Sequence, residues 1–203
     1  DSAQSLGLTI DEVIHNGINL HEFRPIKKNL ETKKRVLLYC GSHPVKGQNY
    51  GCNIIRRCQE MKLNATYHSI GETFEQNRHL FDQNHGWLKG LEYVQAYQEA
   101  DIFVYPSFSD GFPAPPLEAA ACGCTVVTTL VSGVDEYAHT CDAFYILPWN
   151  DAAAAARTVG EALQRHERKM TLSDSTMQTI SRFSWETSSK KLVSFLGFSE
   201  HNH

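Results

Sequence analysis

Apolar runs rich in β-branched residues alternate along this chain with segments of helical periodicity, and this alternation restricts the possible folds more than any other feature. The pattern predicts strands at 35–40, 65–70, 102–105, 125–129 and 144–147. It predicts helices at 49–61, 90–100, 115–122, 152–166 and 185–195, with Asp151 and Ser184 as N-caps of the last two. Strands that alternate with helices form a parallel sheet covered on both faces. We therefore expect a three-layer, doubly wound α/β domain.

The chain is long enough for one full domain with a buried core. It has 203 residues, and no repeat or Pro- or Ser-rich linker divides them. Apolar residues make up 41% and charged residues 21%, which excludes the disordered and low-complexity classes. The longest apolar runs have about five residues, far fewer than the roughly 18 that span a bilayer, so we expect no membrane insertion by this segment. We interpret residues 1–203 as a single domain.

Charge and cysteine usage exclude two further classes of protein. The formal net charge is −4, with basic and acidic residues spread along the chain, so no nucleic-acid partner is expected. Six cysteines are too few for a disulfide scaffold, which favours a reducing compartment, the cytoplasm. Cys122 and Cys124 have no second pair at ligand spacing, so no metal site is predicted.

The loop after the first predicted strand is a candidate phosphate site. It begins with Gly41 and Ser42 and ends with Lys46 and Gly47, immediately before a helix. Ligands of open parallel sheets bind beyond the carboxyl ends of the strands, and amides at a helix start favour an anion. The loop does not match the P-loop pattern, and an ordinary turn with a solvated lysine is an equal alternative.

The loop after strand 102–105 carries two acidic residues eight positions apart, Asp110 and Glu118. We place Asp110 in the loop and Glu118 in the first turn of the next helix, so that both face one crevice with free helix amides between them. A carboxylate accepts hydrogen bonds from vicinal hydroxyls such as those of a ribose or a hexose. The alternative is a turn aspartate and a surface glutamate that complements the helix dipole.

This loop and its surroundings resemble a known enzyme family. Residues 105–127, with two acids separated by seven positions, resemble the signature of the group 1, family-four retaining glycosyltransferases of GT-B fold. Further family landmarks lie in order at 15–25, 85–88, 100–104, 132–136 and 183–186. The resemblance spans residues of about 14 to 195 and implies a Rossmann-like, donor-binding C-terminal domain. Residues 1–30 would then form the interdomain junction and 184–197 the C-terminal helix, and the N-terminal acceptor-binding domain would be missing.

The resemblance also implies roles for individual residues. Glu118 would hold the ribose hydroxyls of a nucleotide-sugar. Asp110, where the family more often has Glu, would lie beside the donor sugar, and Lys46 would bind the diphosphate, although Ser42 stands where an Arg is usual. Asp110 and Lys46 are therefore the candidate catalytic residues. The other candidate substrate-binding residues are Gly41, Ser42, Leu88 near the nucleobase, Gly111, Phe112, Pro113, Ala114 and Leu117.

The function implied by the resemblance is glycosyl transfer from a nucleoside-diphosphate sugar to an acceptor with retention of configuration, without a cofactor or a catalytic metal. Lys46 and helix amides would stabilise the charge that develops on the diphosphate. The isolated chain is expected to bind the donor and to transfer little or nothing. Two alternatives stay open: a degenerate, non-catalytic glycosyltransferase-like binding module, and a small doubly wound domain of another function.

Overall fold

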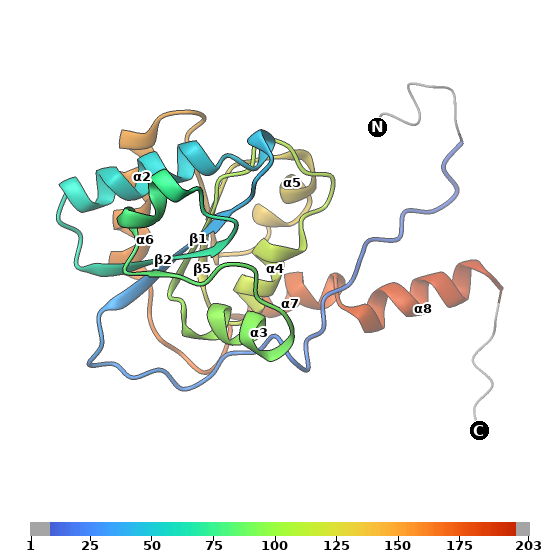
Figure 1. Ribbon diagram of the computed structural model, residues 1–203. Coiled ribbons are helices and arrows are strands. Elements are labelled where there is room, and N and C mark those ends of the chain that lie inside the picture. The colour runs from blue at the N-terminus through green and yellow to red at the C-terminus, as the bar shows by residue number, and fades with distance from the viewer. Residues whose placement is uncertain (1–8, 198–203) are drawn as a thin grey trace.

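The computed structural model describes residues 9–197, so the first eight residues of the predicted junction lie outside the described residues (Figure 1). Within this range six strands form one sheet in the order β3-β2-β1-β4-β5-β6, and each neighbouring pair is parallel. The strands are β1 (Lys34–Cys40), β2 (Ala65–Gly71), β3 (Gln83–Asn84), β4 (Ile102–Tyr105), β5 (Thr125–Thr128) and β6 (Phe144–Ile146). The α-helices are α2 (Gln48–Glu60), α3 (Gly90–Glu99), α4 (Ala114–Ala121), α5 (Ser132–Ala138), α6 (Ala152–Arg165), α7 (Asp174–Arg182) and α8 (Trp185–Phe195).

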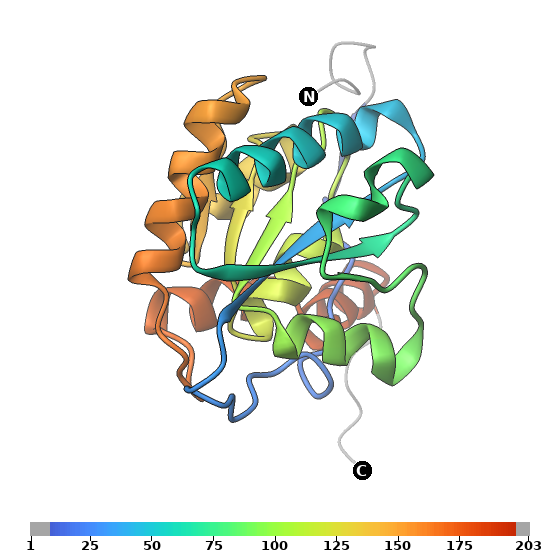
Figure 2. The same cartoon turned by 60° about the vertical axis from the view of Figure 1, so that its left-hand side comes forward.

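Helices cover both faces of the sheet, as the alternating sequence pattern predicts (Figures 1 and 2). Along β1, Val36 and Leu38 point into a core shared with α2 and α6. Leu37 points into the opposite core, which is shared with α3, α4, α5 and α7. All three side chains are fully buried because β1 lies in the middle of the sheet. The predicted three-layer, doubly wound fold is confirmed.

Two predicted helix starts are confirmed by their capping hydrogen bonds. The Asp151 carboxylate accepts from the N–H groups of Ala153 and Ala154 at 3.0 and 2.9 Å. Ser184 Oγ accepts from the Thr187 N–H at 3.1 Å. Such caps satisfy backbone donors that have no partner inside the helix.

Several elements were not predicted: α5, α7, β3 and the short 3₁₀ helices η1 (Pro44–Lys46) and η2 (Glu75–Leu80). The strand β3 has only two residues, which is too short for an alternating pattern. α7 is short and mostly polar, and Ile180 is its buried large apolar residue, so few apolar positions mark this helix in the sequence.

The direction in which strands are added reverses between β1 and β4, which are neighbours in the sheet. Ligands of doubly wound sheets bind at such a switch point, beyond the carboxyl ends of the strands. The loops that begin at Gly41 and Pro106 leave the sheet at this point. The topology therefore brings the two candidate loops of the sequence to the same edge.

A buried carboxylate, that of Asp101, lies at the opposite edge of the sheet, where the strands begin. Asp101 is fully buried, and Arg168 donates to both of its oxygens at 2.8 Å. Arg35 N–H also donates to Asp101 at 2.8 Å, and Lys28 Nζ lies 3.5 Å away. Burial opposes ionisation, but the contacts with His166, Arg168 and Lys28 outweigh it and hold the pKa of Asp101 well below its usual range. This cluster joins the segment before β1, through Lys28, and the segment after α6, through Arg168, to the start of β4.

The segment around Ile18 lies against the start of α8. Ile18 N–H donates to the Phe183 carbonyl at 2.9 Å, and Trp185 N–H donates to the Ile18 carbonyl at 3.0 Å. A Cβ at Gly17 would collide with the backbone of Trp185, so this close approach requires a glycine. α8 then extends away from the sheet (Figure 1). Across the described residues, no helix has the length and apolar content needed to cross a membrane.

Candidate active site

The two candidate catalytic residues lie in direct contact at the carboxyl edge of the sheet. Lys46 Nζ is 2.5 Å from Asp110 Oδ2, and the side chains are 27% and 19% exposed. Tyr105 at the end of β4 donates its hydroxyl to the same carboxylate oxygen at 2.6 Å. A Cβ at Gly41 would lie 2.7 Å from Lys46 Cβ, so the glycine gives the lysine stem room to pass over the end of β1. Asp110 therefore has one cationic and one neutral donor.

The two loops are joined by backbone contacts as well as by this ion pair. Phe108 N–H donates to the Val45 carbonyl at 2.6 Å, and Ser107 Oγ donates to the same oxygen at 3.2 Å. Gly47 ends η1 with φ of 69°, and a Cβ there would collide with the Pro106 carbonyl. Only glycine adopts this conformation easily and allows the approach. The loops therefore form one unit with Lys46 beside Asp110.

The turn after Asp110 is packed against α5 and the junction segment. Ser132 Oγ donates to the Asp110 carbonyl at 3.3 Å. A Cβ at Gly133 would lie 2.6 Å from Phe112 Cα, so α5 can reach the turn only through a glycine. The Phe112 ring lies 4.7 Å from the His15 ring. His15 is a neighbour of the candidate site that the sequence did not assign.

The start of α4 offers fewer free amides than the sequence suggested. The helix begins at Ala114 with Pro113 as N-cap, and Pro115 and Pro116 follow. A helix leaves its first four N–H groups without internal partners, but proline has no N–H. Three of the four positions at this end are prolines, so Ala114 supplies the remaining N–H. The expected array of free amides between Asp110 and Glu118 is wrong.

Glu118 is the fifth residue of α4, so its predicted place in the first turn is also wrong. It is half-buried, and its Oε2 accepts a hydrogen bond from the Tyr93 hydroxyl on α3 at 2.8 Å. Tyr93 in turn lies 2.7 Å from the hydroxyl of the fully buried Tyr97. Burial raises the pKa of the Glu118 carboxyl, and the Tyr93 hydrogen bond opposes that shift.

The structure does not bring all of the candidate residues together. Ser42 and Gly111 are exposed, and the Ser42 hydroxyl has no hydrogen bond among the described residues. The Leu117 side chain is buried in the core, so it can offer a ligand its backbone alone. Leu88 lines a cavity beside β3 and α3 with Asn84, His85 and Glu92. Glu118 has its hydrogen bond with Tyr93, whereas Lys46 and Asp110 bond to each other.

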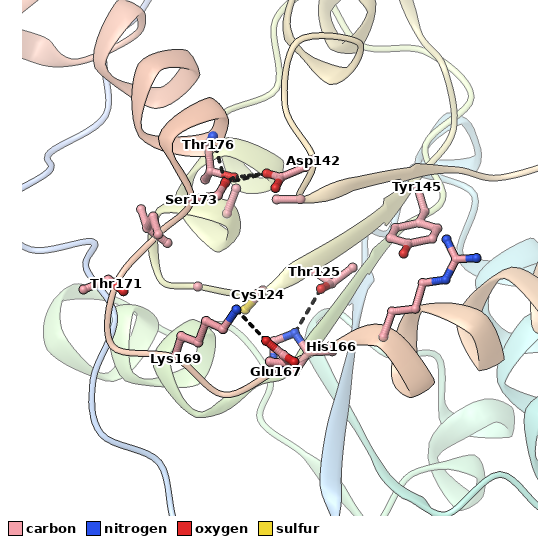
Figure 3. A pocket seen from close by; sticks show the side chains of 15 residues that line it. Cys124, Thr125, Asp142, Tyr145, His166, Glu167, Lys169, Thr171, Ser173 and Thr176 are labelled. Carbon is pink, nitrogen blue, oxygen red and sulfur yellow. Dashed lines mark hydrogen bonds and ion pairs between the residues drawn. The ribbon is translucent and has the colours of Figure 1, made fainter.

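A separate cavity lies at the amino edge of the sheet, between β5, β6 and the start of α7 (Figure 3). Asp142 there accepts hydrogen bonds from the hydroxyls of Ser173, Ser175 and Thr176 at 2.6, 2.7 and 2.8 Å. The Asp142 carboxylate thus lies at the start of α7, a position that favours negative charge. Among residues 9–197, no group of three or more His, Cys, Asp or Glu is arranged to hold a metal ion.

Comparison with known sequences decides the family. The sequence profile described as "Glycosyl transferases group 1" matches residues 34–165, which include both candidate loops. The chain belongs to the group 1 glycosyl transferases. The match covers the sheet from β1 to the end of α6, so the fold and the family signature lie in the same segment of this group 1 glycosyl transferase.

Two curated relatives of this group 1 chain match about half of it. The D-inositol 3-phosphate glycosyltransferase of Corynebacterium urealyticum is 30% identical over 102 residues, which cover 50% of this chain and 24% of that protein. The O-antigen chain mannosyltransferase B of Escherichia coli is 32% identical over 114 residues, which cover 53% of this chain and 29% of that protein. The matched segment is therefore about a quarter of each relative.

Solved structures confirm the fold of this group 1 chain. The sucrose-phosphate synthase of Thermosynechococcus elongatus superposes with a TM-score of 0.74 at 21% identity, covering 92% of this chain and 52% of that one. Anabaena HepE, crystallised with UDP and glucose, superposes with a TM-score of 0.74 at 16% identity, covering 92% and 56%. The fold is the Rossmann-like, C-terminal half of a GT-B glycosyltransferase, as the resemblance implied.

Proposed function

We propose that this chain binds a nucleoside-diphosphate sugar and serves the transfer of its glycosyl group to an acceptor with retention of configuration. The observation that carries the proposal is the meeting of Lys46 and Asp110 at the switch point of the sheet, from loops 64 residues apart. A cation and a carboxylate placed together there match the two halves of such a donor: a diphosphate and a polyhydroxylated ring.

In the proposed complex the diphosphate takes Asp110's place as the partner of Lys46. The lysine is partly exposed, so its ammonium is accessible to an anion. Asp110 keeps its hydrogen bond from Tyr105 and becomes available to accept one from a hydroxyl of the donor sugar. Binding of the donor therefore exchanges the ion pair of Lys46 for a phosphate contact and leaves the Asp110 carboxylate with neutral hydroxyl donors.

The chemical step in this proposal places negative charge on the leaving diphosphate when the bond to the sugar breaks. Lys46 stabilises that charge, and the Ala114 N–H adds one oriented donor at the start of α4. No organic cofactor takes part, and the family resemblance implies a metal-free reaction. The acceptor binds to the N-terminal domain of a GT-B enzyme, so the isolated chain binds the donor and transfers little.

A second candidate function is a non-catalytic binding module. The observation that favours it is the loss of N–H donors at the start of α4, where three of four positions are prolines. A helix end with few donors stabilises a leaving diphosphate less. Nucleotide binding separates the two candidates, because a module that has lost its donor chemistry has no reason to prefer a diphosphate.

The test is calorimetric titration of the folded chain with UDP, GDP and TDP, each compared with its bare nucleoside. We expect at least one diphosphate to bind more tightly than about 1 mM, or −4.1 kcal/mol, and more tightly than its nucleoside. A folded chain that binds none of the three at that level contradicts the proposed function.

A further inference from the structure

Glu118 is a partly buried carboxylate that no cation neutralises among the described residues. Its hydrogen-bond partner is the Tyr93 hydroxyl, which donates to Oε2 at 2.8 Å. Asp110 differs, since it has the Lys46 ammonium as well as the Tyr105 hydroxyl. A buried carboxylate without a cation depends on neutral donors to stay ionised. Tyr93 therefore decides the state of Glu118 more than any other described side chain.

The Tyr93 hydroxyl is itself fixed by a second tyrosine. Tyr93 has one hydroxyl proton and donates it to Glu118, so at 2.7 Å it accepts the proton of Tyr97. The two rings meet edge to face with centroids 4.9 Å apart, and Tyr97 is fully buried. Burial raises the pKa of both phenols, which keeps them protonated and able to donate. Successive hydrogen bonds of this kind strengthen one another.

The two carboxylate oxygens of Glu118 differ in their hydrogen bonding. Oε2 takes the Tyr93 hydrogen bond, whereas Oε1 has no protein partner among the described residues. A single fixed hydrogen bond holds one side of the carboxylate and leaves the other side for a ligand. The geometry points to the accessible oxygen as the acceptor for a hydroxyl of the bound nucleotide.

We infer that Tyr93 is a positioning residue for nucleotide binding, which holds Glu118 through Oε2 so that Oε1 accepts a hydrogen bond from the ribose of a ribonucleoside diphosphate. The inference rests on the proposed function and adds to it a residue outside both candidate loops. Tyr93 touches Glu118 and acts through it. The chemical class of ligand that depends on Tyr93 is one with vicinal ribose hydroxyls.

The inference also gives the pH dependence of binding. The titratable groups near the Glu118 carboxyl are Tyr93 and Tyr97 on α3, Tyr39 on β1, and Cys122, which directly follows α4. The ionised Glu118 carboxylate is a stronger acceptor for a hydroxyl proton than its protonated form, so the affinity falls as the pH drops through the pKa of Glu118. The Tyr93 hydrogen bond lowers that pKa. In a variant without the Tyr93 hydrogen bond, the affinity for the nucleotide therefore falls at a higher pH.

The experiment compares Tyr93→Phe with Tyr67→Phe. Tyr67 is a matched control because its hydroxyl is buried on the opposite face of the sheet without a hydrogen-bond partner. Each variant and the wild-type chain are titrated with the tightest-binding ribonucleoside diphosphate and with its 2′,3′-dideoxy form, from pH 5 to pH 8. Thermal unfolding of each variant reports whether the fold is retained.

We expect Tyr93→Phe to bind the ribonucleotide about tenfold more weakly at neutral pH, as for the loss of a hydrogen bond to a charged group. Tyr93→Phe is expected to bind the dideoxy nucleotide as tightly as the wild type does. Tyr67→Phe is expected to bind both nucleotides with wild-type affinity. An equal loss for both ligands overturns the inference, because Tyr93 then acts through the fold. Unchanged affinity and pH profile in Tyr93→Phe also overturn it, while a wild-type chain that binds neither ligand overturns the proposed function itself.

Discussion

Lys46 Nζ and Asp110 Oδ2 lie 2.5 Å apart, although 64 residues separate them in the sequence. The contact joins the loop after β1 to the loop after β4, at the point where the order of strand addition reverses. Since both side chains are partly exposed, the ion pair contributes only about 0–1 kcal/mol to stability. Both residues can therefore be changed while the fold is kept.

Lys46→Ala is expected to weaken binding of a nucleoside diphosphate at least tenfold, because a charge-assisted hydrogen bond contributes about 1.5–3 kcal/mol. Binding of the bare nucleoside stays unchanged, since it has no phosphate. The salt dependence of diphosphate binding also becomes weaker. Calorimetry at two salt concentrations measures both effects. Unchanged diphosphate affinity would mean that the loop from Gly41 to Gly47 is an ordinary turn.

Asp110→Asn is expected to act in the opposite direction on the nucleoside diphosphate. The variant removes the carboxylate that competes with phosphate for Lys46, so the affinity for the diphosphate rises several-fold. The affinity for the complete sugar donor gains less, because the amide is a weaker acceptor for a sugar hydroxyl. Parallel titrations with a nucleoside diphosphate and its sugar derivative measure the difference. A fall in diphosphate affinity would show that Asp110 orients Lys46 instead of competing for it.

Much of the fold was predictable from the sequence, because strands such as 102–105 and caps such as Asp151 are local features. The candidate residues Lys46 and Asp110 were also found locally. Their contact was not predicted, since it depends on which strands become neighbours. The contact between Tyr93 and Glu118 could not be predicted from the sequence either, because Tyr93 resembles any aromatic residue on a helix that packs against the core.

The start of α4 was predicted in part. The prolines at 115 and 116 correctly indicated a helix start, but the exact first residue decides which amides are free. The helix begins one residue before these two prolines, and Pro113 is its N-cap, so Ala114 holds the remaining free N–H of the first four positions. Proline has no N–H wherever the helix begins, so the shortage of free amides follows from these residues themselves, and the expected array of amides overlooked it.

Gly133→Ala is expected to lower nucleotide affinity at least tenfold while most of the fold survives. The new Cβ would lie 2.6 Å from Phe112 Cα and force the turn after Asp110 to move. Gly160→Ala is the matched control, because its Cβ would meet Leu63 at an ordinary 3.6 Å in the middle of α6. Titration and thermal unfolding of both variants make the comparison. Wild-type affinity in Gly133→Ala would show that the turn after Asp110 does not take part in ligand binding.

Asp101→Asn is expected to lower the free energy of unfolding by about 3–5 kcal/mol, because it leaves buried cationic groups without their carboxylate. Because the native pKa of Asp101 is depressed, its stabilising contribution is complete above the unfolded pKa near 3.8 and is lost as the pH falls below it. Asp135→Asn, which changes an exposed pair with His139, is the control. Urea unfolding between pH 2 and pH 7 checks both. Equal, small effects would contradict the structural role of Asp101.

The most direct test of the account is a crystal structure of the chain with the nucleoside diphosphate that binds it most tightly. We expect a phosphate oxygen and Lys46 Nζ within hydrogen-bond distance, about 3 Å, and a ribose hydroxyl at the same distance from Glu118. The Lys46–Asp110 contact of 2.5 Å should be longer in that complex. A nucleotide bound at the amino-edge cavity beside Asp142, with Lys46 still paired to Asp110, would contradict the account.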